Sequence, residues 1–255
     1  MNKKILISTG GSGGHVIPAT IIYKHLENNF DVSITSDFRG VKFLNKDEYN
    51  LKIFNVKPIS KNLLIMPFDF LLVIISIFKS ISFLRKNKIN ILISTGGYMS
   101  LPLCIGAKIL NIKLLLFEPN MVLGRSNKFF ISYCQKIFCY SNNVKKFPPK
   151  FKNKIKVIPA LLRKNFYDKR DSNNTLDIIN LLIIGGSQGA KIFDDLVKNA
   201  IIELSKKYKL KIYQQTSSIN FESFKKTYEN NNINCELFNF NDDVINFMHK
   251  TDLCI

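Results

Sequence analysis

The stretch Lys4–Pro18 reads KILISTGGSGGHVIP, and it decides the fold expected for the first part of the chain. Lys4–Ser8 is a short, mostly apolar run typical of a buried strand, and a turn with four glycines in the five positions Gly10–Gly14 follows it. An amphipathic stretch comes next, with Pro18 near the start of the helix that we expect there. A strand, a glycine turn and a helix in this order predict a parallel α/β sheet.

This glycine turn has two interpretations. Glycines let the backbone approach an anion closely, and the N-terminus of the following helix then faces that anion. The same residues could also form no more than a tight turn. The turn is not a dinucleotide-binding G-x-G-x-x-G motif, because Val16 occupies the position of the last glycine, and no Gly-Lys-Ser/Thr of a P-loop follows it.

Two further glycine turns recur along the chain. Ile5–Gly11, ILISTGG, is repeated without change at Ile91–Gly97. This repeat is either chance convergence or the sign of two strands that present glycine turns at the ligand-binding carboxyl edge of one sheet. The other turn is Gly185–Ala190, GGSQGA, between an apolar run and a helix-like stretch. Its Ser187 is suited to cap that helix, to donate its hydroxyl to an anion, or to do both.

Short apolar runs with little alternation continue along the chain, which suits strands covered by helices on both faces. We expect strands at Lys4–Ser8, Val32–Thr35, Lys52–Val56, Ile89–Ser94, Lys113–Phe117, Lys136–Tyr140, Ile155–Ile158, Asn180–Ile184, Lys209–Gln214 and Asn234–Phe238, and a last one beginning at Leu253. The polar stretch Lys164–Asn180 predicts a linker between two Rossmann-like, doubly wound α/β domains, 1–162 and 163–255. Because the last strand lacks a covering helix, we expect the second domain to be incomplete.

The composition limits the partners. With 255 residues and 46% hydrophobic content the chain is long enough for a core, and its net charge of +18 favours an anionic partner, although a biased coding composition explains the charge equally well. Nucleic acid is the weakest candidate, because no recognition motif is present. The five cysteines are scattered without C-x-x-C spacing, so we expect mostly buried free thiols and neither disulfides nor a zinc site.

The most apolar segment is Leu63–Phe83. A proline and two charged residues interrupt it, and the uncharged run that remains is too short to cross a bilayer. Basic residues flank the segment, Lys61 before it and Arg85 and Lys86 after it. The pattern predicts a pair of helices lying on an anionic membrane surface, with a buried crossover helix as the alternative.

Five segments together resemble the signature segments of the MurG family of N-acetylglucosaminyltransferases, in their order and approximate spacing. They are Gly10–Pro18 (GGSGGHVIP), Gly96–Ser100 (GGYMS), Glu118–Lys128 (EPNMVLGRSNK), Gly185–Ala190 (GGSQGA) and Asn241–Val244 (NDDV). The resemblance covers essentially the whole chain. It departs from the family where HEQN reads Phe117-Glu118-Pro119-Asn120, where only Arg163 of GNPxR is kept, and where the chain ends before a further donor-binding stretch.

The resemblance implies a GT-B glycosyltransferase without cofactor or metal. It would transfer N-acetylglucosamine from UDP-N-acetylglucosamine to undecaprenyl-diphospho-muramoyl-pentapeptide, with inversion, at the cytoplasmic face of the bacterial inner membrane. The N-terminal domain would bind the acceptor and the C-terminal domain the UDP-sugar. Position by position, the resemblance assigns substrate contacts to Ser12, Gly13, Gly14, Asn120, Arg163, Ser187 and Val244.

Transfer requires a base for the acceptor hydroxyl and positive charge for the leaving diphosphate. His15 is the natural base, Glu118 is the alternative, and a purely structural role of His15 in the glycine turn stays open. Helix N-termini and Arg163, with Gly186, Ser187 and Gln188, are the candidates for the leaving group.

Two other functions compete with this interpretation. One is a non-catalytic, membrane-bound module that holds a lipid diphosphate and needs a partner, which the early end of the chain favours. The other is a sugar-nucleotide transferase of the same architecture that acts on a different lipid, which the GGSQGA and GGYMS segments disfavour.

Overall fold

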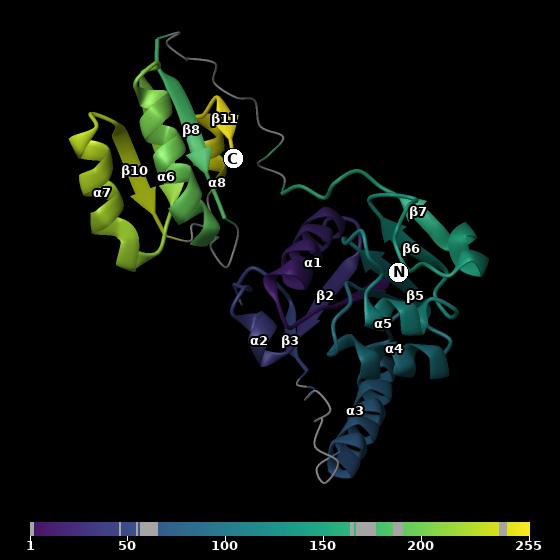
Figure 1. Ribbon diagram of the computed structural model, residues 1–255. Coiled ribbons are helices and arrows are strands. Elements are labelled where there is room, and N and C mark those ends of the chain that lie inside the picture. Colours follow the sequence, from purple (N-terminus) through teal and green to yellow (C-terminus); the bar gives the residue numbers. More distant parts are fainter. Residues whose placement is uncertain are drawn as a thin grey trace. The chain divides into compact units, whose positions relative to one another are not determined.

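The computed structural model describes residues 3–45, 47–54, 56, 66–163, 166, 177–185, 191–239 and 244–255, without the side chains of 191–195 (Figure 1). The chain divides into two compact units, Met1–Leu162 and Arg163–Ile255. The division falls where the sequence places the domain boundary. Each unit has a parallel sheet of its own with helices between successive strands, so the expected α/β fold is confirmed.

The first unit is built on a seven-stranded sheet in the order β3-β2-β1-β4-β5-β6-β7, and all of its neighbouring strands pair in parallel. Its strands are β1 (Lys4–Ser8), β2 (Asp31–Ser36), β3 (Leu51–Ile53), β4 (Ile91–Ser94), β5 (Lys113–Glu118), β6 (Lys136–Cys139) and β7 (Ile155–Val157). The sheet grows from β1 in one direction and from β4 in the other. The strand order therefore reverses between β1 and β4, and the carboxyl edge at such a switch point is where open α/β sheets bind ligands.

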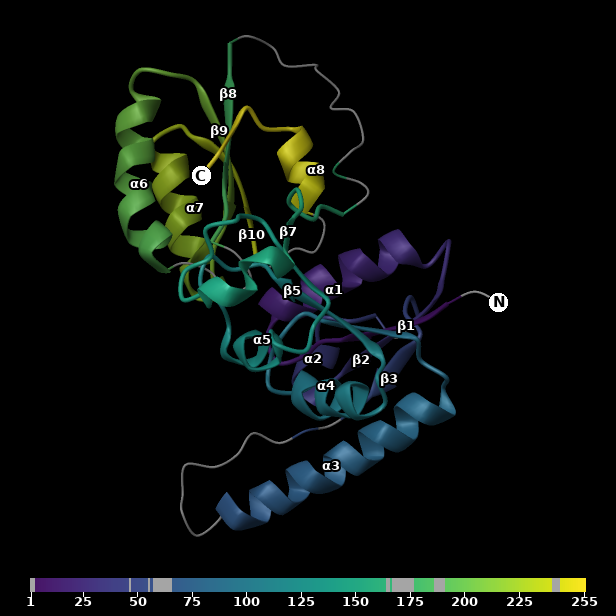
Figure 2. The same cartoon turned by 90° about the vertical axis from the view of Figure 1, so that its right-hand side faces the viewer.

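Helices cover both faces of this sheet. Ile5 and Ile7 of β1 pack in one core with α1 (Gly13–Leu26), whereas Leu6 packs in another core with α4 (Ser100–Ile109). Figure 2 shows α1 on one side of the sheet and α4 on the other. Burial on both faces explains why the strands are apolar runs without alternation. The remaining short helices of the unit are α2 (Phe38–Val41), α5 (Arg125–Phe130) and the 3-10 helix η1 (Pro149–Lys154).

Helix α1 corrects one expectation. It begins at Gly13, directly after the glycine turn, and Pro18 lies inside it instead of near its start. The N–H groups of His15 and Val16 donate to the carbonyl of Ser12 at 3.1 and 3.2 Å, so the helical turn forms before the proline is reached. The glycine turn and the helix N-terminus are consequently one continuous feature.

The apolar segment forms a single helix, α3 (Met66–Lys86), so the expected helix pair is wrong for the residues described. Pro67 is its second residue, and a proline in the first helical turn removes an N–H that has no helical partner there. Only Val73, Ser80 and Leu84 of α3 are buried. The exposed apolar side chains rule out a fully buried crossover helix; they include Phe68, Phe70, Leu71, Ile75 and Phe78.

The second unit has a four-stranded parallel sheet in the order β10-β9-β8-β11. Its elements are β8 (Ile179–Ile183), α6 (Lys191–Ser205), β9 (Leu210–Gln215), η3 (Ser218–Asn220), α7 (Phe221–Asn230), β10 (Asn234–Phe238), α8 (Val244–His249) and β11 (Leu253–Cys254). Leu181 and Ile183 pack with α7 residues such as Phe224, whereas Leu182 packs with Phe247 of α8. The strand that the sequence predicts to begin at Leu253 is confirmed as the two-residue strand β11, and it forms one edge of this sheet.

All five cysteines are free. Cys104, Cys134 and Cys139 are buried as expected, and burial raises the pKa of Cys104 to about 12. Cys254 is exposed on the edge strand β11, which corrects the expectation for that thiol.

Candidate active site

The two identical heptapeptides lie side by side at the switch point of the first sheet. β1 and β4 pair in register from Ile5 opposite Ile91 to Ser8 opposite Ser94. Their glycine turns consequently meet, and a Cβ atom added at Gly97 would lie 3.3 Å from the carbonyl oxygen of Gly10. The expectation that both strands present a glycine turn at one carboxyl edge is confirmed. This close approach of the two backbones leaves little room for a side chain at Gly97.

His15 connects the two turns. Its Nδ1 lies 2.8 Å from the carbonyl oxygen of Thr95, and a Cβ atom at Gly96 would lie 3.3 Å from its Cε1. Because a carbonyl only accepts, Nδ1 carries the hydrogen and Nε2 of the neutral ring keeps its lone pair. No described residue bonds to Nε2, and the ring is half-buried. The geometry therefore holds His15 in the tautomer that a base needs and also gives it a structural role.

The N-terminus of α1 carries no acidic residue in its first turn, and the N-cap Ser12 makes no side-chain capping bond. Ser12 and Gly14 are exposed, whereas Gly13 is buried. The described part of the chain provides no hydrogen-bond acceptor for the amides of Gly13 and Gly14. A helix end in this state keeps its partial positive charge and suits an anion.

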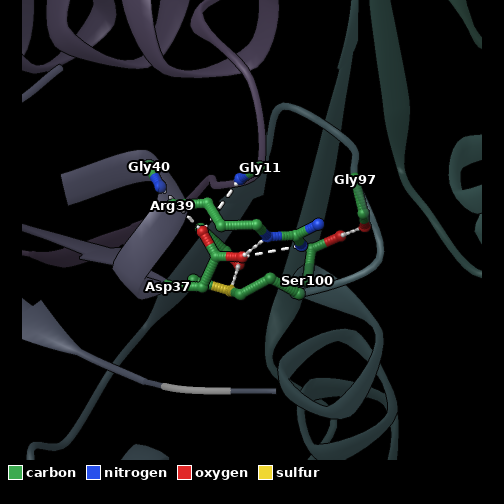
Figure 3. A network of polar contacts seen from close by, with 8 residues as sticks. Gly11, Asp37, Arg39, Gly40, Gly97 and Ser100 are labelled. Carbon is green, nitrogen blue, oxygen red and sulfur yellow. Dashed lines mark hydrogen bonds and ion pairs between the residues drawn. The ribbon is translucent and has the colours of Figure 1, made fainter. Parts of the chain in front are cut away.

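One amide of the glycine turn is not available to a ligand. The N–H of Gly11 donates to Oδ1 of Asp37 at 2.9 Å, and the N–H of Gly40 donates to the same oxygen at 2.9 Å (Figure 3). Arg39 donates to Oδ2 of Asp37 through Nε and also lies 2.8 Å from it through Nη2. Burial alone would raise the pKa of Asp37, but the two backbone N–H groups and the guanidinium outweigh it and hold the pKa below its usual value.

The Asp37–Arg39 pair was not among the residues expected from the sequence. A signal was present, because an acidic residue, an arginine and Gly40 directly follow the predicted strand Val32–Thr35. That strand neighbours β1, so its carboxyl end reaches the same edge of the sheet. Without the pairing of β2 with β1, nothing in the sequence places Asp37 beside Gly11.

Glu118, the second base candidate, is buried and fully engaged. Its Oε1 accepts from the backbone and side-chain N–H groups of Asn120 at 3.2 and 2.9 Å. Its Oε2 accepts from the N–H of Gly124 at 2.8 Å and from the side chain of Asn127 at 3.0 Å. Four donors on one carboxylate indicate an acid that organises the loop after β5, so the geometry favours His15 as the base.

Asn120 is exposed at this loop, with its amide nitrogen held by Glu118. Arg163 is the first residue of the second unit and is half-buried. Val244 is the first residue of α8. Ser187, with Gly186 and Gln188, lies outside the described residues. The roles expected for all of these residues stay predictions. Within the ranges that the structure describes, no group of three or more His, Cys, Asp or Glu side chains is arranged to hold a metal ion.

The chain matches two family models. Residues 5–139 match the glycosyltransferase family 28 N-terminal domain, and residues 180–255 match the glycosyltransferase family 28 C-terminal domain. The whole chain is 88% identical to the UDP-N-acetylglucosamine–N-acetylmuramyl-(pentapeptide) pyrophosphoryl-undecaprenol N-acetylglucosamine transferase of Pelagibacter ubique, of which it spans 72%. The transferase of that name from Rickettsia bellii is 32% identical, over 99% of this chain and 72% of its own length.

Solved structures with a similar fold include a MurG and an epimerase. Acinetobacter baumannii MurG superposes with a TM-score of 0.74 at 24% identity, over 99% of this chain and 72% of that one. A UDP-GlcNAc 2-epimerase from Neisseria meningitidis, bound to UDP-GlcNAc, superposes with a TM-score of 0.63 at 14% identity, over 98% of this chain and 76% of that one. At these identities the likeness shows the fold.

Proposed function

Because the chain belongs to glycosyltransferase family 28, we propose that it transfers N-acetylglucosamine from UDP-N-acetylglucosamine to undecaprenyl-diphospho-muramoyl-pentapeptide in peptidoglycan synthesis. The 88% identity to a transferase with that donor and acceptor in its name, over the whole chain, is the observation that carries the proposal. The switch point of the first unit supports it, since glycine turns and an uncapped helix N-terminus meet there.

The reaction exchanges one bond at the anomeric carbon. The acceptor hydroxyl forms a new C–O bond, the bond to the UDP oxygen breaks, and inversion follows from this single displacement. The hydroxyl proton goes to Nε2 of His15, whose tautomer the carbonyl of Thr95 fixes through Nδ1. The departing diphosphate carries the electron pair away, and Arg163 and Ser187 are our candidates for stabilising it.

The first glycine turn is the proposed site of the acceptor diphosphate. The amides of Gly13 and Gly14 and the hydroxyl of Ser12 have no acceptor among the described residues, and the partial charge of α1 adds to them. Asn120, held by Glu118 at the neighbouring strand end, contributes a further polar contact to the substrates. In the second unit, the resemblance to the MurG family implies that the backbone of Val244 contacts the uracil of the donor, and we include this contact in the proposal.

We also propose that α3 docks the protein peripherally on the anionic, cytoplasmic face of the inner membrane. By length and composition alone α3 could cross a membrane, but Asp69 and Lys79 divide it and leave an uncharged run that is too short to do so. Of its most apolar window, 17% is buried. Phe68, Phe70 and Phe78 are 62%, 58% and 68% exposed, and Arg85 and Lys86 lie in the last turn. Exposed aromatic side chains on a helix that ends in basic residues suit the surface of a bilayer with anionic headgroups.

Co-sedimentation with vesicles that contain anionic lipid tests this docking. Replacing Phe68 and Phe70 together with serine should weaken binding by at least about a hundredfold, because each buried aromatic side chain is worth roughly 1.5–3 kcal/mol. Ile219→Ser removes an apolar side chain that is 92% exposed in the second unit, and it serves as the control. Unchanged binding of the double variant would contradict the role of α3.

The transfer reaction itself is tested with labelled UDP-N-acetylglucosamine and a short-chain analogue of the acceptor, using this chain. Formation of the disaccharide product supports the proposal. If the chain binds the acceptor but forms no product, the partner-dependent binding module is the better description of this chain. If it neither binds the acceptor nor forms product, the proposed function is wrong for this chain.

A further inference from the structure

We propose that Arg39 binds the diphosphate of the lipid-linked acceptor and that Asp37 positions it for that contact. The inference rests on the proposed function and adds a residue that the sequence motifs of the glycine turn do not contain. Asp37 and Arg39 come from the end of β2 and the start of α2, not from the turn itself. The two loops meet because β2 pairs with β1.

The guanidinium lies against the first glycine turn. A Cβ atom added at Gly11 would meet Nη2 of Arg39 at 3.9 Å, and no other heavy atom outside its own neighbours lies within 4 Å of it. The close approach depends on glycine at two other positions. A Cβ at Gly10 would lie 2.8 Å from Oδ1 of Asp37, and one at Gly40 would lie 3.0 Å from Cα of Gly10. Because Gly10 and Gly40 have no side chains, the loop that carries Arg39 can pack closely against the glycine turn.

The side chain is held in one orientation before any ligand arrives. Nε and Nη2 of Arg39 both point at Oδ2 of Asp37, at 2.8 Å each, as Figure 3 shows. Asp37 is itself fixed, since it is buried and Oδ1 accepts two backbone N–H groups. An arginine that is already oriented loses less conformational entropy when it binds an anion.

The donors that remain fit a diphosphate. Asp37 occupies the N–H of Gly11, so the turn offers the anion fewer amides than its glycines suggest. Arg39 has five N–H groups, of which two point at Asp37, and its side chain is 56% exposed. The other three lie on the outer part of the guanidinium, which can bind phosphate oxygens in pairs. The amides at the N-terminus of α1 suit one phosphate group, and the guanidinium of Arg39 suits the second phosphate group of a diphosphate.

Direct binding separates this role from a structural one. The probes are a short-chain diphosphate-linked muramoyl-pentapeptide and its monophosphate-linked counterpart, each titrated into this chain and its variants. We expect Arg39→Gln to weaken binding of the diphosphate ligand by about ten- to hundredfold, with a smaller loss for the monophosphate ligand. Arg39→Lys should recover part of the loss. Asp37→Asn should lose about tenfold while the arginine is still present.

Lys42→Gln is the matched control, because it removes one positive charge from an exposed residue just after α2. It should change both affinities by less than about twofold. Thermal unfolding of each variant shows whether the loops are intact. An equal loss for both ligands, or no loss in Arg39→Gln, overturns the proposal, and so does a matching loss of UDP-N-acetylglucosamine affinity, which would assign Arg39 to the donor. If the unmodified chain binds neither acceptor ligand, the proposed function fails first.

Discussion

Two stretches of identical sequence, Ile5–Gly11 and Ile91–Gly97, pair in register in one sheet and end in turns with different surroundings. In the first turn the N–H of Gly11 leaves its own segment and donates to Asp37, and the chain continues into the exposed N-terminus of α1. In the second turn the N–H of Gly96 donates to Ser94 within the same heptapeptide, and Gly97 accepts from Ser100. The first turn is open toward ligands and the second is closed on itself.

The difference shows that a glycine motif specifies the backbone path but not its chemical role. Gly11 and Gly97, the last residues of the two copies, have the same φ of +83°. Their neighbours differ, since only Arg39 Nη2 lies near a Cβ at Gly11, whereas a Cβ at Gly97 meets Gly10 and His15. His15, which follows the first turn, links the two turns by donating a hydrogen bond to the carbonyl oxygen of Thr95 in the second heptapeptide. The four predictions that follow test this division between an open turn and a closed one.

The largest effect is expected at His15. His15→Asn keeps an N–H close to the position of Nδ1, and hence the bond to Thr95, but removes Nε2. We expect kcat to fall by about 10²–10⁴-fold, with a change in the free energy of unfolding below about 1 kcal/mol. Steady-state transfer kinetics and urea unfolding measure the two quantities.

His15→Gln is the complementary variant, because it places a polar atom near the position of Nε2 but loses the hydrogen bond to Thr95. His25→Asn is the matched control, an exposed histidine of the same helix, and should leave kcat unchanged. Full activity in His15→Asn would assign His15 a structural role only.

Alanine at the last glycine of each copy compares the two turns directly. Both positions have a left-handed φ, which costs roughly 1–2 kcal/mol for a residue with a Cβ. Gly97→Ala also crowds the carbonyl of Gly10 at 3.3 Å, so we expect it to lower the free energy of unfolding by about 1 kcal/mol more than Gly11→Ala does. Urea denaturation of both variants gives the difference, and equal losses would show that the second turn is no tighter than the first.

The open turn should respond to acid through Asp37. The pKa of Asp37 is lower in the folded chain than its ordinary 3.8, so its stabilising effect is present above that value and is lost as pH falls through the folded pKa. We expect Asp37→Asn to lower the free energy of unfolding by about 1–2 kcal/mol at neutral pH. The gap to the unmodified chain should stay constant down to about pH 5 and narrow below about pH 4. A gap that widens in acid would contradict the assigned direction.

The smallest effect is expected when the serine before each turn, Ser8 or Ser94, is replaced by alanine. Ser94 accepts the N–H of Gly96, whereas the side chain of Ser8, among the residues that the structure describes, makes only a weak bond to the sulfur of Met99 at 3.6 Å. Ser94→Ala should therefore cost about 1 kcal/mol, because it leaves an N–H in the closed turn without a partner. Ser8→Ala should cost less than about 0.5 kcal/mol. Thermal unfolding of the two variants measures both losses. A loss of stability in Ser8→Ala that equals or exceeds the loss in Ser94→Ala would show that the closed turn does not depend on Ser94.

Much of the fold was predictable from local patterns. β1 and β10 have the predicted limits, and most other strands agree within two residues, because an apolar run between turn residues is a local signal. The helix pair expected at Leu63–Phe83 was wrong because Pro67 falls in the first turn of α3, where proline does not break a helix. Pro18 lies inside α1 instead of near its start because the helix already begins at Gly13, directly after the glycine turn.

The candidate site was predictable only in part. The glycine turns and His15 are visible in the sequence because their residue types are unusual in such positions. Glu118 was recognised as an acid at a strand end, but its four hydrogen-bond donors lie in the loop and helix that follow, so its organising role needed the folded loop. Asp37 and Arg39 were missed altogether.

The sequence by itself determined the parallel α/β strand pattern, the backbone path of the glycine turns and the membership of a glycosyltransferase family, since these depend on residue type and local spacing. Only the tertiary structure decided which turn is open. The bond from Gly11 to Asp37 spans 26 residues and that from His15 to Thr95 spans 80. Such partners are chosen by strand order and register, which arise when the whole sheet assembles and buries both of its faces.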